Sequence, residues 1–243
     1  MPHLIVQATT TLASASDEAT LTPIHEELAL AQRLPQTHLV DAGYIDADGL
    51  AAAQSRFQVD VVGPTRGNFR WQARDQQGFD GHQFQVDWEA HQAICPQGHA
   101  SVHWQQTYDR RPGREHEMIT VKFAAADCRP CPCRTSCTRA APRTLTLHPR
   151  EEELALRAAR QREQTPEFVQ IYAQRAGVEA THAQALRTCG LRQSRYYGHA
   201  KTHLQHVLTA TTLNVVRLGA WLTGTPTAPT RESAFSRFMT QAA

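Results

Sequence analysis

The sequence lacks any apolar run of the roughly 18 to 20 residues that a membrane-spanning helix needs. Its first residues, Met1-Pro2-His3-Leu4, also lack the basic and long apolar regions of a secretory signal peptide. We therefore expect a cytoplasmic protein with no membrane segment. In that reducing compartment the six cysteines are poor disulfide candidates, and four of them fall within ten residues, which favours a metal site.

A large excess of charge of either sign is also missing. Lys and Arg number 25 against 23 Asp and Glu, in a chain of 243 residues of which 41% are hydrophobic. This balance excludes a polybasic or polyacidic chain, and the apolar fraction excludes disorder throughout. The length allows one large domain or two smaller ones.

Strand-like and helix-like segments alternate over the first 62 residues. We expect a strand over residues 3–11, a short amphipathic helix over 24–34, a strand over 37–40, a helix over 47–56 capped by Asp46, and a strand over 59–62. Such alternation predicts an α/β layer. Asp41 would then lie at the carboxyl end of a strand, where the sites of α/β proteins usually occur.

Residues 65–148 differ in composition from both flanks. Gly, Gln and aromatic residues alternate, Pro and Cys cluster, and no segment keeps a helical period, so we expect a β-rich insertion. Helical period returns over residues 151–162, 166–190 and 201–222. On one side of the last helix lies a stripe that predicts a core-facing surface, made of Leu204, Leu208, Val215, Leu218 and Leu222.

The strongest local pattern is Cys128-Arg-Pro-Cys131-Pro-Cys133-Arg-Thr-Ser-Cys137, preceded by Cys95-Pro-Gln-Gly-His99. A C-x-x-C turn presents two thiolates, and a tetrahedral ion needs two more soft ligands from elsewhere. We expect a structural Zn²⁺ bound by Cys95, Cys128, Cys131 and Cys137. Cys133, His99 and His103 are alternative ligands, and unligated small hydrophobic cysteines are the alternative to a metal site.

Acidic residues are absent from two stretches, which leaves each of them basic. No Asp or Glu lies between Asp127 and Glu151, and none lies from Ala180 to Arg231. The two tracts predict a surface for a polyanion, on which Tyr196-Tyr197 are placed to stack against bases. Scattered arginines on solvated faces are the alternative. The candidate DNA contacts are Arg187, Arg192, Arg195, Lys201 and His203.

A further pattern is Tyr172-Ala-Gln-Arg175-Ala-Gly-Val-Glu179. Phe168, Tyr172, Arg175 and Glu179 are spaced by four, three and four residues, which predicts one shared helical face. Taken alone, an Arg–Glu pair four residues apart is usually a solvated surface pair. Taken alone, Asp41 in Leu39-Val40-Asp41-Ala42-Gly43-Tyr44 suits a hard divalent ion but is more typical of a turn cap.

The Asp41 motif, the cysteine pattern and the Tyr172-to-Glu179 motif occur in the order found in bacterial insertion-sequence transposases of the DDE class. The chain resembles that family to about Leu222, in the branch with a Cys-rich, zinc-ribbon-like insertion between the second Asp and the Glu. The resemblance implies an α/β, ribonuclease-H-like catalytic core that lacks its first strand. Residues 1–66 and the helical part at 149–223 would form this core, around a β-rich insertion at 67–148, and residues 224–243 would be a flexible tail.

The resemblance also implies an activity: DNA cleavage and strand transfer by two-metal phosphodiester chemistry. Asp41 and Glu179 match the second and third acids that hold Mg²⁺ or Mn²⁺. Tyr172 and Arg175 match the residues before the Glu, where Arg175 would orient a phosphate or hold Glu179. The implied partners are terminal-repeat and target DNA in the bacterial nucleoid and, for the full-length protein, further copies of the chain.

The resemblance departs from the family at the start of the sequence. Family members carry the first catalytic Asp on a strand before the stretch matched by His3-Leu4-Ile5-Val6, whereas the first acid here is Asp17, which we expect to cap a helix. We therefore expect an N-terminally truncated copy with little strand-transfer activity of its own. Two alternatives stay open: a zinc-ribbon DNA-binding module without catalysis, and a degraded fragment that does not fold stably.

Overall fold

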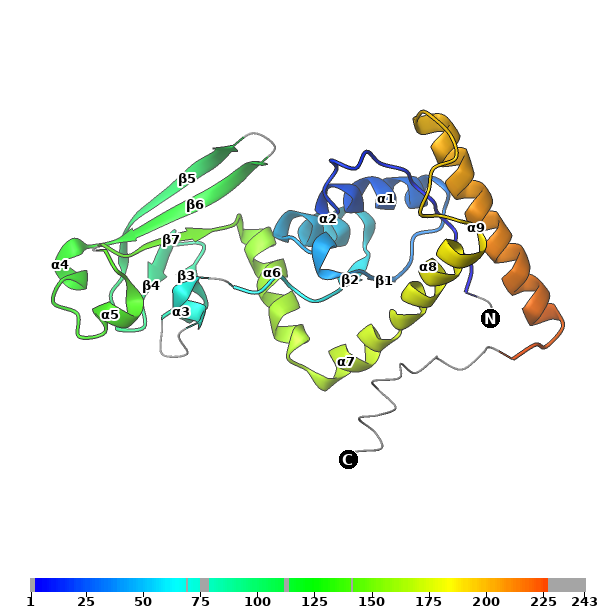
Figure 1. Cartoon of the computed structure of the whole chain (residues 1–243). Coiled ribbons are helices and arrows are strands. Elements are labelled where there is room, and N and C mark those ends of the chain that lie inside the picture. Colours follow the sequence, from blue (N-terminus) through cyan, green and yellow to red (C-terminus); the bar gives the residue numbers. More distant parts are fainter. Residues whose placement is uncertain (1–2, 69, 75–78, 112–113, 141, 227–243) are drawn as a thin grey trace. The chain divides into compact units, whose positions relative to one another are not determined.

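The computed structural model describes residues 3–68, 70–74, 79–111, 114–140 and 142–226 (Figure 1). The chain divides into two compact units, the large unit Ala13–Ala176 and the small unit Met1–Leu12 with Gly177–Ala243. The tail predicted at 224–243 lies almost wholly outside the described residues. Within the described ranges, no helix combines the length and apolar character needed to cross a membrane.

The large unit begins with a parallel βαβ arrangement. Its elements are α1 (Glu18–Leu30), β1 (Thr37–Leu39), the 3₁₀ turn η1 (Ala42–Tyr44), α2 (Ala47–Phe57) and β2 (Asp60–Val62). β1 pairs in parallel with β2, with Thr37 opposite Asp60 and Leu39 opposite Val62. The strands predicted at 37–40 and 59–62 and the helix capped by Asp46 are confirmed. α1 starts earlier than predicted and contains Pro23.

A small apolar core holds these elements together. Its buried members include Leu21 of α1, Leu50 of α2 and Val61 of β2, and Ala159 of α6 (Arg150–Glu163) completes it. The Arg162 guanidinium donates to Asp60 Oδ1 and to the Val61 carbonyl, both at 2.6 Å, and so ties α6 to β2. Because α2 crosses from β1 to β2, the carboxyl ends of both strands lie at one edge, which carries Asp41.

The β-rich character predicted for residues 65–148 is confirmed. The elements are α3 (Trp71–Arg74), η2 (Gly81–Gln83), β3 (Gln85–Asp87), β4 (Gln92–Ile94), β5 (Ser101–Arg111), β6 (Arg114–Phe123), α4 (Ala125–Cys128), α5 (Arg134–Cys137) and β7 (Thr144–Leu147). β3 and β4 form one antiparallel pair, and β5, β6 and β7 form an antiparallel sheet in that order. In Figure 1 the β5–β6 hairpin extends well beyond β7. Phe84, Val121 and Leu145 lie in the buried core of this region.

The single helix predicted over residues 166–190 is wrong. The chain forms α7 (Pro166–Ala173) and α8 (Ala176–Thr188) instead. At the break, the backbone N–H groups of Gln174 and Arg175 bond to carbonyls three residues back rather than four. Gly177, a poor helix former, is the second residue of α8. The predicted face through Phe168, Tyr172, Arg175 and Glu179 is therefore divided between two helices.

In the small unit the strand predicted over residues 3–11 is wrong. No strand is assigned to residues 3–12, and the backbone of Ile5 bonds instead to the Asn214 amide through two 2.8 Å hydrogen bonds. Asn214 belongs to α9 (His199–Leu222), whose extent agrees with the predicted helix. The prediction that its stripe faces a core is also wrong. Every residue of that stripe is exposed, and the buried positions are Gln205, Thr209 and Leu213.

Candidate functional site

Asp41 lies directly after the buried Val40, where β1 leads into η1. Its Oδ1 accepts a hydrogen bond from the Gly43 N–H at 2.9 Å and caps the 3₁₀ turn, as the turn-cap alternative predicted. The Asp41 side chain remains 43% exposed. The Asp41 side chain therefore combines a fixed orientation with access from solvent.

Arg175 connects the two motifs that the sequence separates. Its Nη2 lies 3.3 Å from Asp41 Oδ2, and its side chain is largely buried. Arg175 was expected to orient a phosphate or to hold Glu179, and the structure pairs it with Asp41. The break between α7 and α8 occurs at this residue. The Arg175 cation of the Tyr172-to-Glu179 motif thus balances the charge of the Asp41 carboxylate.

Asp17 is a second carboxylate at the same edge, and sequence reasoning set it aside as a helix cap. It precedes α1, but its side chain makes no capping hydrogen bond. A Cβ atom added at Gly43 would lie 2.8 Å from Asp17 Oδ2 and 3.0 Å from Asp41 Oδ1. Gly43 therefore keeps open a space between two carboxylates. Nothing in the spacing of the sequence indicates this approach, because the two residues lie on different elements.

Charges around this edge affect Tyr44 as well. Burial, and after it the charges of Asp17 and Asp41, raise the pKa of Tyr44, whereas Arg175 lowers it. Arg66 donates to the Gly43 carbonyl at 3.0 Å and pairs with Glu18 at 2.5 Å. The result is a carboxylate-rich corner whose loop is held by arginine side chains.

The other two predicted active-site residues lie on the helices that follow. Tyr172 on α7 is half-buried and stacks on Phe168, with ring centroids 5.4 Å apart. Glu179 lies exposed in the first turn of α8 and belongs to the small unit.

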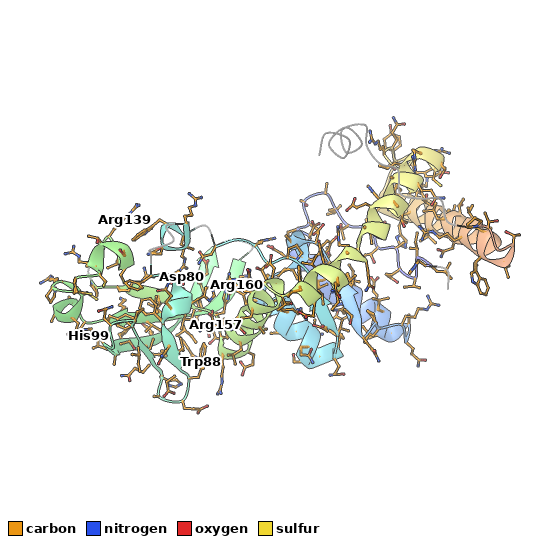
Figure 2. The ribbon with its side chains drawn as sticks, turned by 90° about the horizontal axis from the view of Figure 1, so that it is seen from below. Asp80, Trp88, His99, Arg139, Arg157 and Arg160 are labelled. Carbon is orange, nitrogen blue, oxygen red and sulfur yellow. The ribbon has the colours of Figure 1, made fainter. Side chains whose placement is uncertain are left out.

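Five of the six cysteines line one cavity in the β-rich region. These are Cys95, Cys128, Cys131, Cys133 and Cys137, and His99 joins them. The cavity measures about 30 Å³, enough for a water-sized group. His103 is not among the lining residues and lies 3.2 Å from Gln105 Oε1. His99 is labelled in Figure 2 among the strands of this region.

Local turns explain how distant cysteines reach this cavity. Cys95 follows β4 and opens a turn in which the Gly98 N–H donates to the Cys95 carbonyl at 2.8 Å. Gly98 has φ +83°, a conformation that favours glycine. Cys128 ends α4 and Cys137 ends α5, so two short helices present their last residues to the same space. The Cys137 N–H also bonds to the Cys133 carbonyl at 3.1 Å.

Arg143 also lines the cavity, and sequence reasoning did not single it out. Its residue is only 7% exposed, its Nε has no hydrogen-bond partner, and its Cζ lies 5.5 Å from the centroid of the Phe84 ring. Burial lowers the pKa of Arg143 while Cys137 raises it, and burial raises the pKa of Cys137 while Arg143 lowers it. A buried guanidinium needs an anion, and the neighbouring thiols are groups that can provide one on ionisation.

The donor atoms of the carboxylate corner at Asp41 and those of the cysteine cavity suit different metals. The carboxylates of Asp17 and Asp41 suit a hard divalent ion, and the cysteine sulfurs suit zinc. In the described parts of the chain, however, no three or more His, Cys, Asp or Glu side chains are arranged to hold a metal ion. The donor chemistry fits both metals, and the zinc prediction stays a prediction.

The predicted DNA contacts all belong to the small unit. Arg187, Arg192, Arg195 and Lys201 are exposed, and His203 is half-buried against Thr10. Tyr197 is 98% exposed and Tyr196 is exposed beside it. Gly190, with φ +64°, ends α8 and leads into the segment that carries these residues.

The chain belongs to the family described as the transposase DDE domain, which matches residues 94–219, just over half of its length. The matched range contains the five cavity cysteines, Arg175 and Glu179, whereas Asp41 lies before it. No curated protein and no solved structure matches the chain. The family assignment confirms the predicted DDE-class transposase and identifies DNA as the molecule on which the family acts.

Proposed function

We propose that this chain carries the catalytic residues of a transposase that cleaves DNA at the ends of an insertion sequence and transfers the cut strands. The ion pair between Arg175 and Asp41 is the main support. It joins the Asp41 motif to the Tyr172-to-Glu179 motif, which are 134 residues apart. A coincidental surface pair has no reason to connect the two motifs that define the family resemblance.

In this proposal Asp41 and Glu179 hold Mg²⁺ or Mn²⁺, and Arg175 orients the Asp41 carboxylate until DNA binds. DDE transposase domains generally use divalent metal ions. Two such ions activate an attacking oxygen and stabilise a leaving oxygen at a phosphodiester. Asp17, across Gly43 from Asp41, supplies a further carboxylate at the same edge. Tyr172 contributes by stacking, which fixes the helix that precedes Arg175.

The proposed fold is a ribonuclease-H-like core formed by residues 1–66 and 149–223, with residues 67–148 inserted between them. The parallel pair β1–β2 with Asp41 at its carboxyl end supports this arrangement. The small β sheets of residues 79–147 support an insertion with its own core.

Metal binding by neutralised variants tests the proposal most directly. Asp41→Asn and Glu179→Gln are each expected to weaken Mn²⁺ binding by the full chain at least about tenfold, because each removes an anionic oxygen ligand. Glu167→Gln, an exposed acid on α7, is the matched control. Titration with Mn²⁺, followed by electron paramagnetic resonance, measures the free ion.

Nicking of a supercoiled plasmid in Mn²⁺ tests the reaction itself. Slow nicking that Glu179→Gln abolishes supports catalysis by this chain. Unchanged Mn²⁺ binding in both variants, together with unchanged or tighter DNA binding, contradicts the proposal and favours the alternative of a DNA-binding module without catalysis.

We also propose that Cys95, Cys128, Cys131 and Cys137 bind a structural Zn²⁺ in the insertion. The shared cavity supports this, and so does the buried Arg143, whose charge would be balanced by zinc-bound thiolates. Cys133 and His99 line the same cavity and are the replacement ligands. The exposed Arg187, Arg192, Arg195 and Lys201, with His203, are proposed to contact DNA phosphates.

A further inference from the structure

Three arginines of the large unit lie within electrostatic reach of one another, and we name Arg70, Arg157 and Arg160 the α6 arginine cluster. Arg157 and Arg160 are three residues apart on α6, and Arg70 comes directly before α3. Burial lowers the pKa of Arg160 most, and the charges of Arg157 and Arg70 lower it further. Figure 2 shows Arg157 and Arg160 beside Asp80, where α6 meets the β-rich region.

Among the described side chains, one member of the cluster pairs with an acid and two do not. Glu153 Oε1 accepts from Arg157 Nε at 2.8 Å. A second nearby carboxylate, that of Asp80, caps η2 by accepting from the His82 N–H at 2.9 Å. Asp80 is close enough to raise the pKa of Arg160 but forms no ion pair with it. The cluster therefore carries more positive than negative charge.

Arg160 uses a neutral group where an acid would be the stronger acceptor. Its Nη1 lies 2.6 Å from His82 Nε2. Burial, and after it the charge of Arg160, lower the pKa of His82, so the imidazole accepts this hydrogen bond in its neutral form. An anionic oxygen attracts a guanidinium more strongly than a neutral nitrogen does. An anion can therefore take the place of His82 at Arg160.

The remaining arginines of α6 have the acidic partners that the cluster lacks. Arg150 pairs with Glu89, and Arg162 pairs with Asp60, both at 2.6 Å. The positive charge is therefore local to the cluster and is not a general property of the helix.

The cluster is open to a ligand from solvent. Arg70 and His82 are exposed, and Arg160 is half-buried. A phosphate group offers several anionic oxygens, which the planar forks of more than one guanidinium can bind at once. We propose that Arg70, Arg157 and Arg160 bind one phosphate group, which replaces His82 as the acceptor for Arg160. A DNA backbone and a free phosphate-bearing molecule present the same group.

Titration of the full chain with inorganic phosphate tests the site without metal, so its outcome is independent of the proposed catalysis. The C2-proton NMR resonance of His82, assigned with His82→Gln, is expected to shift at constant pH and ionic strength, because His82 loses its hydrogen bond to Arg160. By isothermal titration calorimetry, Arg160→Gln is expected to weaken phosphate binding at least about tenfold and the exposed Arg70→Gln about threefold.

Arg150→Gln is the matched control, because Arg150 lies on the same helix and is already paired with an acid. It is expected to bind phosphate as the wild type does, and circular dichroism checks that every variant keeps its helices. An unmoved His82 resonance in the wild type overturns the proposal. Equal affinities of Arg160→Gln, Arg70→Gln and Arg150→Gln for phosphate overturn it as well.

A short DNA duplex distinguishes the two sources of the phosphate. If the site binds the DNA backbone, Arg160→Gln is expected to reduce the slope of log K against log salt concentration by about one, whereas Arg150→Gln leaves the slope unchanged. Inorganic phosphate then competes with the duplex. If phosphate binding is lost in Arg160→Gln while the duplex slope stays that of the wild type, the site binds a free phosphate-bearing molecule.

Discussion

The buried His25 and the half-buried Glu152 make folding depend on pH in opposite directions. His25 of α1 has no exposed surface, lies 2.9 Å from His38 through its Nε2, and leaves its Nδ1 without a hydrogen-bond partner. Glu152 in the first turn of α6 lies near Asp46 and Asp48, which disfavour its charge. Each side chain has a pKa in the folded protein that differs from its value in the unfolded chain.

His25→Leu is expected to remove a loss of stability in acid. Burial, and after it His38, lower the pKa of His25 from 6.5 to about 4. The unfolded chain therefore binds a proton as the pH falls below about 6.5 while the folded chain does not, so stability falls toward pH 4. Between pH 7.5 and pH 4.5 the wild type should lose about 2 kcal/mol more of its free energy of unfolding than the variant does, as urea unfolding can measure. The exposed His182→Leu is the control, and equal losses in wild type and His25→Leu would contradict the prediction.

Glu152→Gln is expected to raise the stability of the protein at alkaline pH. Burial, and after it Asp48 and Asp46, raise the pKa of Glu152 from 4.5 to about 7. The stability that the raised pKa of Glu152 contributes is therefore complete below about pH 4.5 and is lost as the pH rises through 7. The variant should exceed the wild type in stability at pH 8 by roughly 1 to 3 kcal/mol and not at pH 4.5. Glu167→Gln serves as the exposed control, and a variant that is less stable at pH 8 would refute this sign.

At the scale of single elements, caps and turns decide where the helices begin and end. Asp46 Oδ1 accepts from the Gly49 N–H at 2.8 Å at the start of α2, and Gly190 provides the positive φ that ends α8. The break between α7 and α8 is a turn closed by backbone hydrogen bonds three residues apart, and Arg175, whose side chain meets Asp41, lies in it. Short polar contacts at element ends thus position the candidate site.

Asp46→Ala is expected to lower the free energy of unfolding by about 1 kcal/mol, because the Gly49 N–H loses its acceptor. Asp48→Ala is the matched control: Asp48 lies in the same first turn, is exposed, and is not the capping residue. Thermal or urea unfolding at pH 7 measures the difference. Equal effects of the two substitutions would show that the cap hydrogen bond adds no stability beyond that of a negative charge at the start of α2.

At the scale of the whole molecule, the described residues of the large unit form two separate cores. One surrounds β1 and β2, and the other lies under the β5–β6–β7 sheet. The second core is small and lies beside the cysteine cavity, so a bound metal would add stability to it. The stability of the first core, around β1 and β2, would not depend on a bound metal.

Removal of metal is therefore expected to loosen one core and not the other. A chelator should speed amide exchange in β4, β6 and β7 and leave α2 unchanged, as hydrogen-exchange mass spectrometry can measure. Cys131→Ser should give the same pattern without chelator, whereas Cys189→Ser, outside the cavity, should not. A metal-free protein with identical exchange in all segments would contradict the zinc proposal.

Much of the local structure follows from the sequence. The strands at 37–40 and 59–62, the Asp46 cap, the β-rich region and the extents of α6 and α9 depend on residue pattern and on contacts close in sequence, so pattern alone predicts them. The same is true of the cysteine turns, whose Pro and Gly fix the backbone locally. The family resemblance rests on motif order, which is also a property of the sequence.

Tertiary structure decided the rest, because the deciding contacts join residues far apart in the chain. Residues 3–11 have the composition of a strand, but their backbone bonds to the Asn214 side chain of α9. The α9 stripe has the period of a core face, but residues 3–10 cover the other side. Asp17, Arg143 and the Arg175–Asp41 pair gain their significance only from neighbours on other elements. Periodicity states which residues share a face, whereas only packing determines what that face meets.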